Sequence, residues 1–92
     1  MENNQVKVVE RPYEVYYRAT YQGKVEVRGQ EIEFRFSEDN NGSEFYVFNG
    51  KNWVESKYDE DSPEWVAYQA CLQWNPADFG EPGEIIEIEE DL

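Results

Sequence analysis

In this 92-residue chain, the carboxylates of Asp and Glu are the side-chain groups numerous enough and closely enough spaced to take part in chemistry. The chain holds 21 Asp and Glu against 8 Lys and Arg, which gives a formal charge of −13 at pH 7. It has no histidine, the commonest general base and metal ligand in proteins. With so many acids, carboxylate pairs arise by chance and do not by themselves indicate acid–base catalysis. We therefore expect a binding protein and not an enzyme.

The remaining residues and motifs that could react or bind a ligand also do not indicate an enzyme. Cys71, the only cysteine, lies in a predicted helix with no histidine to activate it, so we expect a buried, unreactive thiol. No glycine loop typical of phosphate binding and no cysteine pair typical of zinc occurs. Residues 37–42 resemble the start of a calcium loop, but Phe48 stands where the bidentate glutamate belongs. Residues 59–61 could hold a cation only weakly. We expect no cofactor and no metal.

The charge is unevenly distributed along the chain. Every Lys and Arg lies at or before Lys57, so residues 1–57 have a net charge of −2. Residues 58–92 hold 11 acids and no base. Such a run is commonly a solvated face or a disordered tail, but here it is interleaved with residues that normally pack. These residues are Trp65, Tyr68, Leu72, Trp74, Phe79, Ile85, Ile86 and Ile88. A fixed anionic surface is the competing interpretation.

The first half of the chain has the alternation of half-buried strands. Residues 13–21 alternate over nine positions, which predicts one strand. Gln22-Gly23 then offers a turn, and residues 24–28 and 31–36 are the next two strands, separated at Gly29-Gln30. The composition of residues 37–43 predicts a loop. The residues expected on the core face of the first strand are Tyr13, Val15, Tyr17, Ala19 and Tyr21.

The same alternation suggests a second use for the tyrosines. With Arg18 and Arg35 they could form a stacking platform for nucleic-acid bases. Acidic neighbours would weaken phosphate attraction, so a core role is the simpler interpretation. The tyrosines concerned are Tyr13, Tyr16, Tyr17 and Tyr21.

A hairpin and a helix complete the predicted fold. Asn49-Gly50, between apolar residues 45–48 and returning residues 51–55, is a strong hairpin signal. Ser62-Pro63-Glu64 combines a capping hydroxyl, a first-turn proline and an acid, so it predicts the start of a helix. Asn75-Pro76 predicts its end. The helix face is expected to carry Trp65, Tyr68 and Leu72.

We therefore expect a single α+β domain. A bent antiparallel β-meander of four or five strands spans about residues 5–57, and an extra N-terminal strand around Val6–Val9 is a further alternative. A helix at about 63–74 packs on it, and an acidic C-terminal extension covers residues 75–92. Ile86 and Ile88 alternate with Glu87 and Glu89 as in an edge strand, while disorder is the competing prediction for the last residues.

An ordered acidic extension could imitate the phosphates of DNA. Alternate residues of a strand are about 6.6 Å apart, so Glu87, Glu89 and Asp91 would form a regular row of charge. A second cluster would stand where the helix starts, and a third group would bridge the two. The expected partner-binding residues are Asp59, Glu60, Asp61, Glu64, Asp78, Glu81, Glu84, Glu87, Glu89, Glu90 and Asp91.

In size, charge and base-free acidic stretch with interleaved aromatics, the chain resembles the phage-encoded acidic DNA-mimic inhibitors. The resemblance lies in charge layout and includes no shared motif. It implies that the chain blocks the basic nucleic-acid-binding surface of a host DNA-binding protein, such as a nucleoid protein, a restriction or CRISPR nuclease, or a polymerase. Like charge argues against direct contact with nucleic acid or membrane. We expect a cytoplasmic location, since residues 1–10 lack a signal-peptide pattern.

Two further partners stay open. The alternative function is a small adaptor or antitoxin-like interaction module whose aromatic surface makes the contact, with exposed Trp53, Tyr58 or Trp74 as anchors. A second copy of the chain could also pair along the acidic edge strand and form a homodimer. Salt dependence separates mimicry from an aromatic interface, because only the former depends on unscreened charge.

Overall fold

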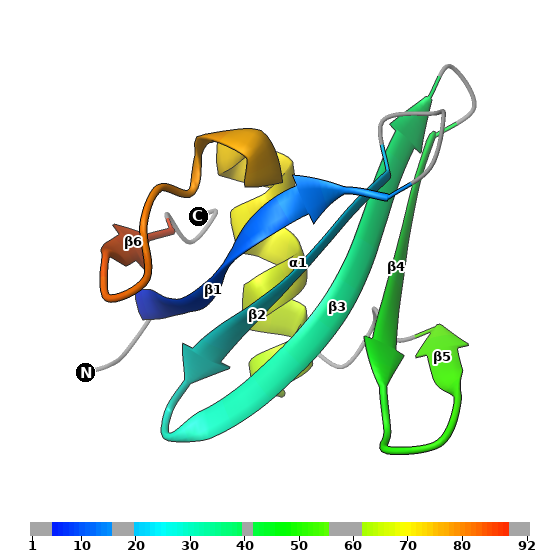
Figure 1. Cartoon of the computed structure of the whole chain (residues 1–92), viewed down its shortest axis with the longest axis horizontal. Helices are drawn as coiled ribbons and strands as arrows, with labels where there is room; N and C mark the ends of the chain where they lie inside the picture. The colour runs from blue at the N-terminus through cyan, green and yellow to red at the C-terminus, as the bar shows by residue number, and fades with distance from the viewer. Residues whose placement is uncertain (1–4, 16–19, 40–41, 56–61, 89–92) are drawn as a thin grey trace.

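The computed structural model describes residues 5–15, 20–39, 42–55 and 62–88. Within these residues a six-stranded antiparallel sheet, in the order β5-β4-β3-β2-β1-β6, has one long helix, α1, against one face (Figure 1). The predicted α+β class is confirmed. The elements are β1 (Gln5–Glu14), β2 (Thr20–Val27), β3 (Gln30–Asp39), β4 (Gly42–Phe48), β5 (Trp53–Glu55), α1 (Pro63–Trp74), the 3₁₀ turn η1 (Pro76–Asp78) and β6 (Ile85–Glu87).

The sheet has six strands, not the four or five predicted. Strands β1 to β5 form the expected meander, and the sixth strand comes from the segment we interpreted as an extension. β6 pairs antiparallel with β1, with Val6 opposite Ile86. Ile86 and Ile88 are buried and Glu87 is exposed, so the predicted alternation of an edge strand is confirmed there. The sequence pattern identified the strand but not its partner.

The tyrosine-rich stretch is not one strand. β1 ends at Glu14 and β2 begins at Thr20, with residues 16–19 outside the described part of the chain. Tyr13 pairs with Gln22, whereas Tyr21 pairs with the buried Phe36. Tyr13 therefore lies on the face away from the helix, with 52% of its surface exposed, and Tyr21 on the helix side. The predicted shared face is wrong because the chain reverses between the two residues.

Gly23 lies inside β2 and not in the predicted turn. The register of β1 against β2 shifts between Glu10 and Tyr13, which places a bulge around Pro12. Proline has no N–H for the ladder and is tolerated at such bulges. A Cβ on Gly23 would stand 2.9 Å from Pro12 Cγ and 3.0 Å from Pro12 Cα. Glycine is therefore required at this position by the close approach of Pro12.

Two turns of the meander have the backbone geometry of hairpins, but the first lies one residue earlier than the predicted Gly29-Gln30, because Gln30 is already the first residue of β3. Arg28 and Gly29 both have positive φ, 55° and 82°, as a two-residue hairpin turn requires. After β4, the chain turns through residues 49–52, where the Asn49 side chain accepts hydrogen bonds from the amides of Lys51 and Asn52 at 2.9 Å. The predicted Asn-Gly hairpin is thus confirmed, although its loop is four residues long.

The predicted loop at residues 37–43 is mostly strand. β3 continues to Asp39 and β4 starts at Gly42, with Glu38 opposite Ser43. These polar residues pair between β3 and β4 at an end of the sheet that contacts water. The same polar composition therefore suits a solvent-exposed strand as well as a loop. Residues 40–41 lie outside the described part of the chain.

Helix α1 has the predicted bounds and the predicted N-cap. Ser62 Oγ accepts a hydrogen bond from the Trp65 amide at 3.1 Å. Trp65 and Tyr68 pack against the core as expected, but Leu72 is 42% exposed. The residues that face the sheet are mainly small, and they let the helix approach it closely. They are Val66, Ala67, Ala70 and Cys71.

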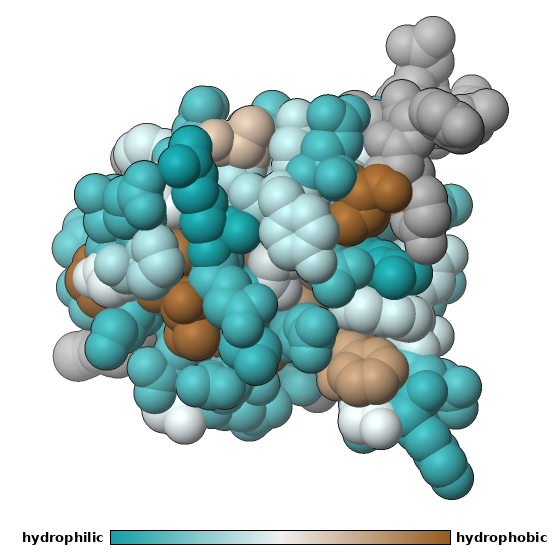
Figure 2. Space-filling view, viewed as in Figure 1, coloured by the Kyte–Doolittle hydropathy of each residue, from teal (hydrophilic) through white to brown (hydrophobic). Residues whose placement is uncertain are grey.

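The core lies between α1 and strands β1 to β4 and is rich in phenylalanine. Phe34 stacks on Phe45 with ring centroids 5.8 Å apart, and Phe79 contacts Phe34 with ring centroids 6.3 Å apart. The opposite face of the sheet contacts solvent. Figure 2 shows that this face is mainly hydrophilic, with apolar side chains in separate places. The two faces of the sheet therefore present different chemistry.

Candidate functional site

The first candidate surface is the acidic segment around β6, which is fixed to β1 by backbone hydrogen bonds. The Val8 amide donates to the Glu84 carbonyl at 2.9 Å, and the Gly83 amide donates to the Val8 carbonyl at 2.7 Å. Strand pairing continues this contact to Glu87, which lies opposite Gln5. Ile85–Glu87 is consequently part of the sheet and residues 83 and 84 are hydrogen-bonded to β1, so the backbone that carries Glu84 and Glu87 has a defined position.

The predicted carboxylates of this segment are exposed. Asp78, Glu81, Glu84 and Glu87 all contact solvent, and residues 62–88 contain no Lys or Arg. A base from elsewhere reaches the segment: Arg11 Nη1 lies 3.0 Å from Glu81 Oε2. Because both groups are largely exposed, this ion pair contributes little to stability. The surface therefore keeps most of its negative charge.

Glu64 lies apart from these carboxylates. It belongs to the first turn of α1, where its Oε2 accepts a hydrogen bond from Gln30 Nε2 at 3.3 Å. Asp78 follows the other end of the helix, and twelve helical residues span about 18 Å. The described acids thus form one group around η1 and β6 and a separate site at the helix start. The remaining predicted residues, Asp59, Glu60, Asp61, Glu89, Glu90 and Asp91, lie outside the described residues.

The aromatic anchors named for the alternative function differ in exposure. Trp74, the last residue of α1, is 48% exposed. Its indole N–H donates to the Glu87 carbonyl at 3.0 Å, which joins the end of the helix to β6. Trp53 is half-buried, and Tyr58 lies outside the described residues.

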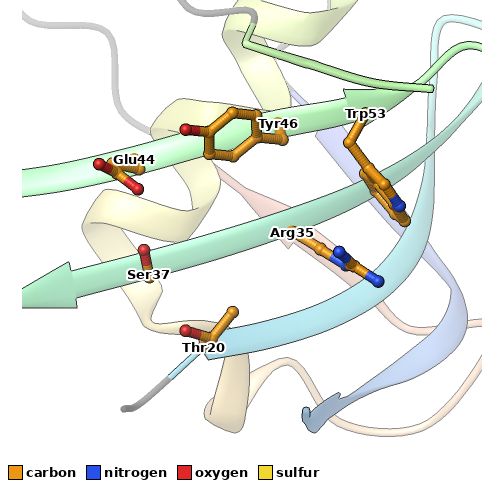
Figure 3. A pocket seen from close by; sticks show the side chains of 6 residues that line it. All are labelled: Thr20, Arg35, Ser37, Glu44, Tyr46 and Trp53. Carbon is orange, nitrogen blue, oxygen red and sulfur yellow. The ribbon is translucent and has the colours of Figure 1, made fainter. Parts of the chain in front are cut away.

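The second candidate surface is a groove of about 260 Å³ on the open face of the sheet (Figure 3). Cross-strand pairing aligns Thr20 with Ser37 and Ser37 with Glu44. The adjacent row carries Arg35 and Tyr46, whose side chains are much longer. The hollow forms because small hydroxyl side chains lie beside large ones. Its lining residues are Thr20, Arg35, Ser37, Glu44, Tyr46 and Trp53.

Arg35 has a fixed position in this groove. Its guanidinium carbon lies 4.2 Å from the centroid of the Trp53 ring, and its Nε donates to Gln22 Oε1 at 2.9 Å. Trp53 contacts Phe48 with ring centroids 5.1 Å apart. The sequence suggests Arg35 as a partner of the tyrosines, because the register that brings it to Trp53 is not visible in the sequence. The groove can accept one polar or aromatic side chain of a partner.

The described part of the chain has one cysteine and several carboxylates that could react or bind a metal. Cys71 is buried as predicted, and burial raises the pKa of its thiol well above the ordinary value, so the thiol stays protonated. Among residues 5–15, 20–39, 42–55 and 62–88, no three His, Cys, Asp or Glu side chains stand close enough to hold a metal ion.

Comparison with protein-family models, with curated proteins and with solved structures finds no match to this chain. No helix in the described residues is long and apolar enough to span a bilayer. The site geometry and the charge distribution are therefore the grounds for a functional proposal.

Proposed function

We propose that this protein is a DNA-mimic inhibitor that binds and blocks the basic nucleic-acid-binding surface of a host DNA-binding protein. The observation that supports the proposal is the fixed acidic segment: residues 62–88 carry five acids and no base, and residues 83–87 are hydrogen-bonded to β1. Carboxylates at defined positions can match the Lys and Arg that normally neutralise phosphates.

Electrostatics favour such a partner over nucleic acid or membrane. A net charge of −13 attracts a basic surface over long range and accelerates association with it. The same charge repels phosphates and anionic lipid headgroups. The inhibitor would therefore act on the protein and compete with DNA for the same groove.

Charge reversal in the C-terminal acidic run of the sequence tests the proposal. Tagged protein is used to capture a partner from a bacterial lysate, with excess duplex DNA added to half of the sample. We expect DNA to displace the partner. The variant Glu87→Lys/Glu89→Lys/Asp91→Lys should then bind the purified partner roughly 10- to 100-fold more weakly, because three attractions become repulsions. Titration calorimetry gives the Kd values.

A matched variant shows whether a loss of affinity comes from the position of the reversed charges or only from the change in net charge. Glu14, Glu31 and Glu38 are exposed acids of β1 and β3, so their reversal to Lys changes the net charge equally. We expect this control to lose much less affinity. Equal losses in the two variants would contradict a defined acidic surface, and a partner that DNA does not displace would contradict mimicry.

The open-face groove favours a second candidate function, a protein-interaction module that binds through an aromatic surface. Trp53 and Arg35 are stacked at 4.2 Å and line a hollow large enough for one side chain. Tryptophan and arginine are the residues most often responsible for interface affinity.

Trp53→Ala distinguishes this function from mimicry. If the groove is the interface, the substitution should weaken partner binding by at least about 30-fold, as expected for a central anchor. The wild-type affinity should change little as salt is added, because an aromatic contact is not screened. Unchanged affinity in Trp53→Ala, together with steep salt dependence, would eliminate the groove as the interface.

A further inference from the structure

We infer that Trp74 is the anchor of the acidic surface and that its indole stacks on an arginine of the basic partner. This inference rests on the proposed function and assigns a specific contact to it. Trp74 is the most exposed of the three tryptophans, since Trp53 and Trp65 are half-buried. A large aromatic ring exposed at the end of a helix is available for a partner.

The position of Trp74 follows from the packing around it. Asn75, with φ of 65°, ends α1, and η1 then directs Phe79 into the core, where it is 1% exposed. Phe79 thus fills the hydrophobic space next to the end of the helix, and Trp74 is left outside. Its side chain is not loose, because the indole N–H donates to the Glu87 carbonyl at 3.0 Å. An aromatic ring held in advance loses little entropy on binding.

The surroundings of Trp74 determine the chemistry of its partner. Asp78 and Glu87 both follow Trp74 in the chain and are exposed, and the Glu87 carbonyl accepts the hydrogen bond of its indole. The C-terminal end of a helix is itself partly negative, and α1 has no basic residue in its last turn. The exposed indole ring of Trp74 is apolar and flat, and the groups around it make the local electrostatic potential negative. A flat cationic group of the partner can therefore stack on the ring and be attracted by the charge. The arginine guanidinium has this character and stacks on indole better than a lysine ammonium does.

Model cationic peptides provide the test. Binding of deca-arginine and deca-lysine to the full-length protein is measured by calorimetry at several salt concentrations. We expect deca-arginine to bind more tightly than deca-lysine. Trp74→Ala should weaken deca-arginine binding about 5- to 30-fold and remove most of the preference for arginine. Leu72→Ala, at an exposed apolar residue of the same helix end, should keep the affinity within about twofold.

NMR of the wild-type protein provides a second test, which does not require the Trp74→Ala variant to fold. The three indole N–H resonances are followed by NMR as deca-arginine is added, with Trp74→Phe used to assign the signal of Trp74. The Trp74 signal should shift more than those of Trp53 and Trp65. Equal shifts of all three signals, or a Trp74→Ala variant that binds like the wild type, would overturn the inference.

The outcomes of these experiments distinguish a failure of the Trp74 inference from a failure of the DNA-mimic proposal. If both peptides bind in a salt-dependent way and Trp74→Ala has no effect, the acidic surface is still supported and the anchor is wrong. If neither peptide binds at low salt, both the anchor and the DNA-mimic proposal are wrong. If arginine preference depends on Trp74, the anchor is supported.

Discussion

Phe79→Ala should lower the free energy of unfolding by about 3–5 kcal/mol, which is the usual range for removal of a buried phenylalanine ring. Phe79 is 1% exposed and contacts Phe34 at 6.3 Å between ring centroids. A domain of 92 residues has a total stability of roughly 5–14 kcal/mol, so the loss is a large fraction of it. Urea unfolding followed by circular dichroism gives the value.

The same substitution also tests how the acidic segment is held. Phe79 is the residue between η1 and the chain leading to β6, so its loss should loosen residues 80–87 before the rest of the sheet. Amide exchange at Val8 and Gly83, which are bonded across β1 and this segment, should increase most. Leu72→Ala is the control, because this residue is 42% exposed and its truncation should cost less than about 1 kcal/mol. A Phe79→Ala loss no larger than that of the control would contradict the packing.

Gly23→Ala should destabilise the protein by about 2–3 kcal/mol, although alanine suits a strand no worse than glycine. The added Cβ would stand 3.0 Å from the Cα of Pro12, and backbone at a bulge cannot easily move away. Thermal and urea unfolding measure the loss. Gly29→Ala is the comparison, because a Cβ added there would meet no atom within 4 Å beyond its chain neighbours, and only its positive φ opposes the substitution. We expect a cost of about 1 kcal/mol there.

A double-mutant cycle identifies Pro12 as the cause. Pro12→Ala removes the Cγ atom that lies 2.9 Å from the added Cβ. The double variant Pro12→Ala/Gly23→Ala should therefore be more stable than the sum of the single changes predicts, by about 1 kcal/mol. Strict additivity would mean that the proline ring and Gly23 do not constrain each other.

The elements that the sequence predicted correctly carry their own local signals. Ser62 and Pro63 determine where α1 begins through hydrogen bonding and backbone geometry within one turn. Asn49-Gly50 specifies a hairpin for the same local reason. The alternation around Ile86 predicted a strand because one face of it is buried. Such signals do not depend on distant residues, so they can be read from a single sequence.

The errors arose where distant contacts decide the structure. A glycine in a strand can mark a turn or the close approach of another backbone, and only the position of Pro12 explains Gly23. Tyr13 and Tyr21 have matching alternation but lie on opposite faces. Leu72 was expected in the core, but small residues of α1 occupy the helix–sheet contact.

The two candidate sites were predictable to different degrees. The acidic segment is visible as a base-free run in the sequence, although its attachment to β1 is not. The groove depends on register across β2, β3 and β4, which brings Thr20, Ser37 and Glu44 into one row. No short-range pattern contains that information.

The pairing of β1 with β6 has a consequence for the timing of folding. It joins residues roughly 80 positions apart, so among the strand pairings of the described residues this one has the largest loop-closure entropy cost. Meander hairpins with short connections can form earlier. Until β6 docks, Val6 and Val8 stand at an open sheet edge and the carboxylates of residues 84–87 have no fixed spacing. A newly synthesised chain would therefore acquire its ordered anionic surface only in the last step of folding. It would be able to bind its partner only after that step.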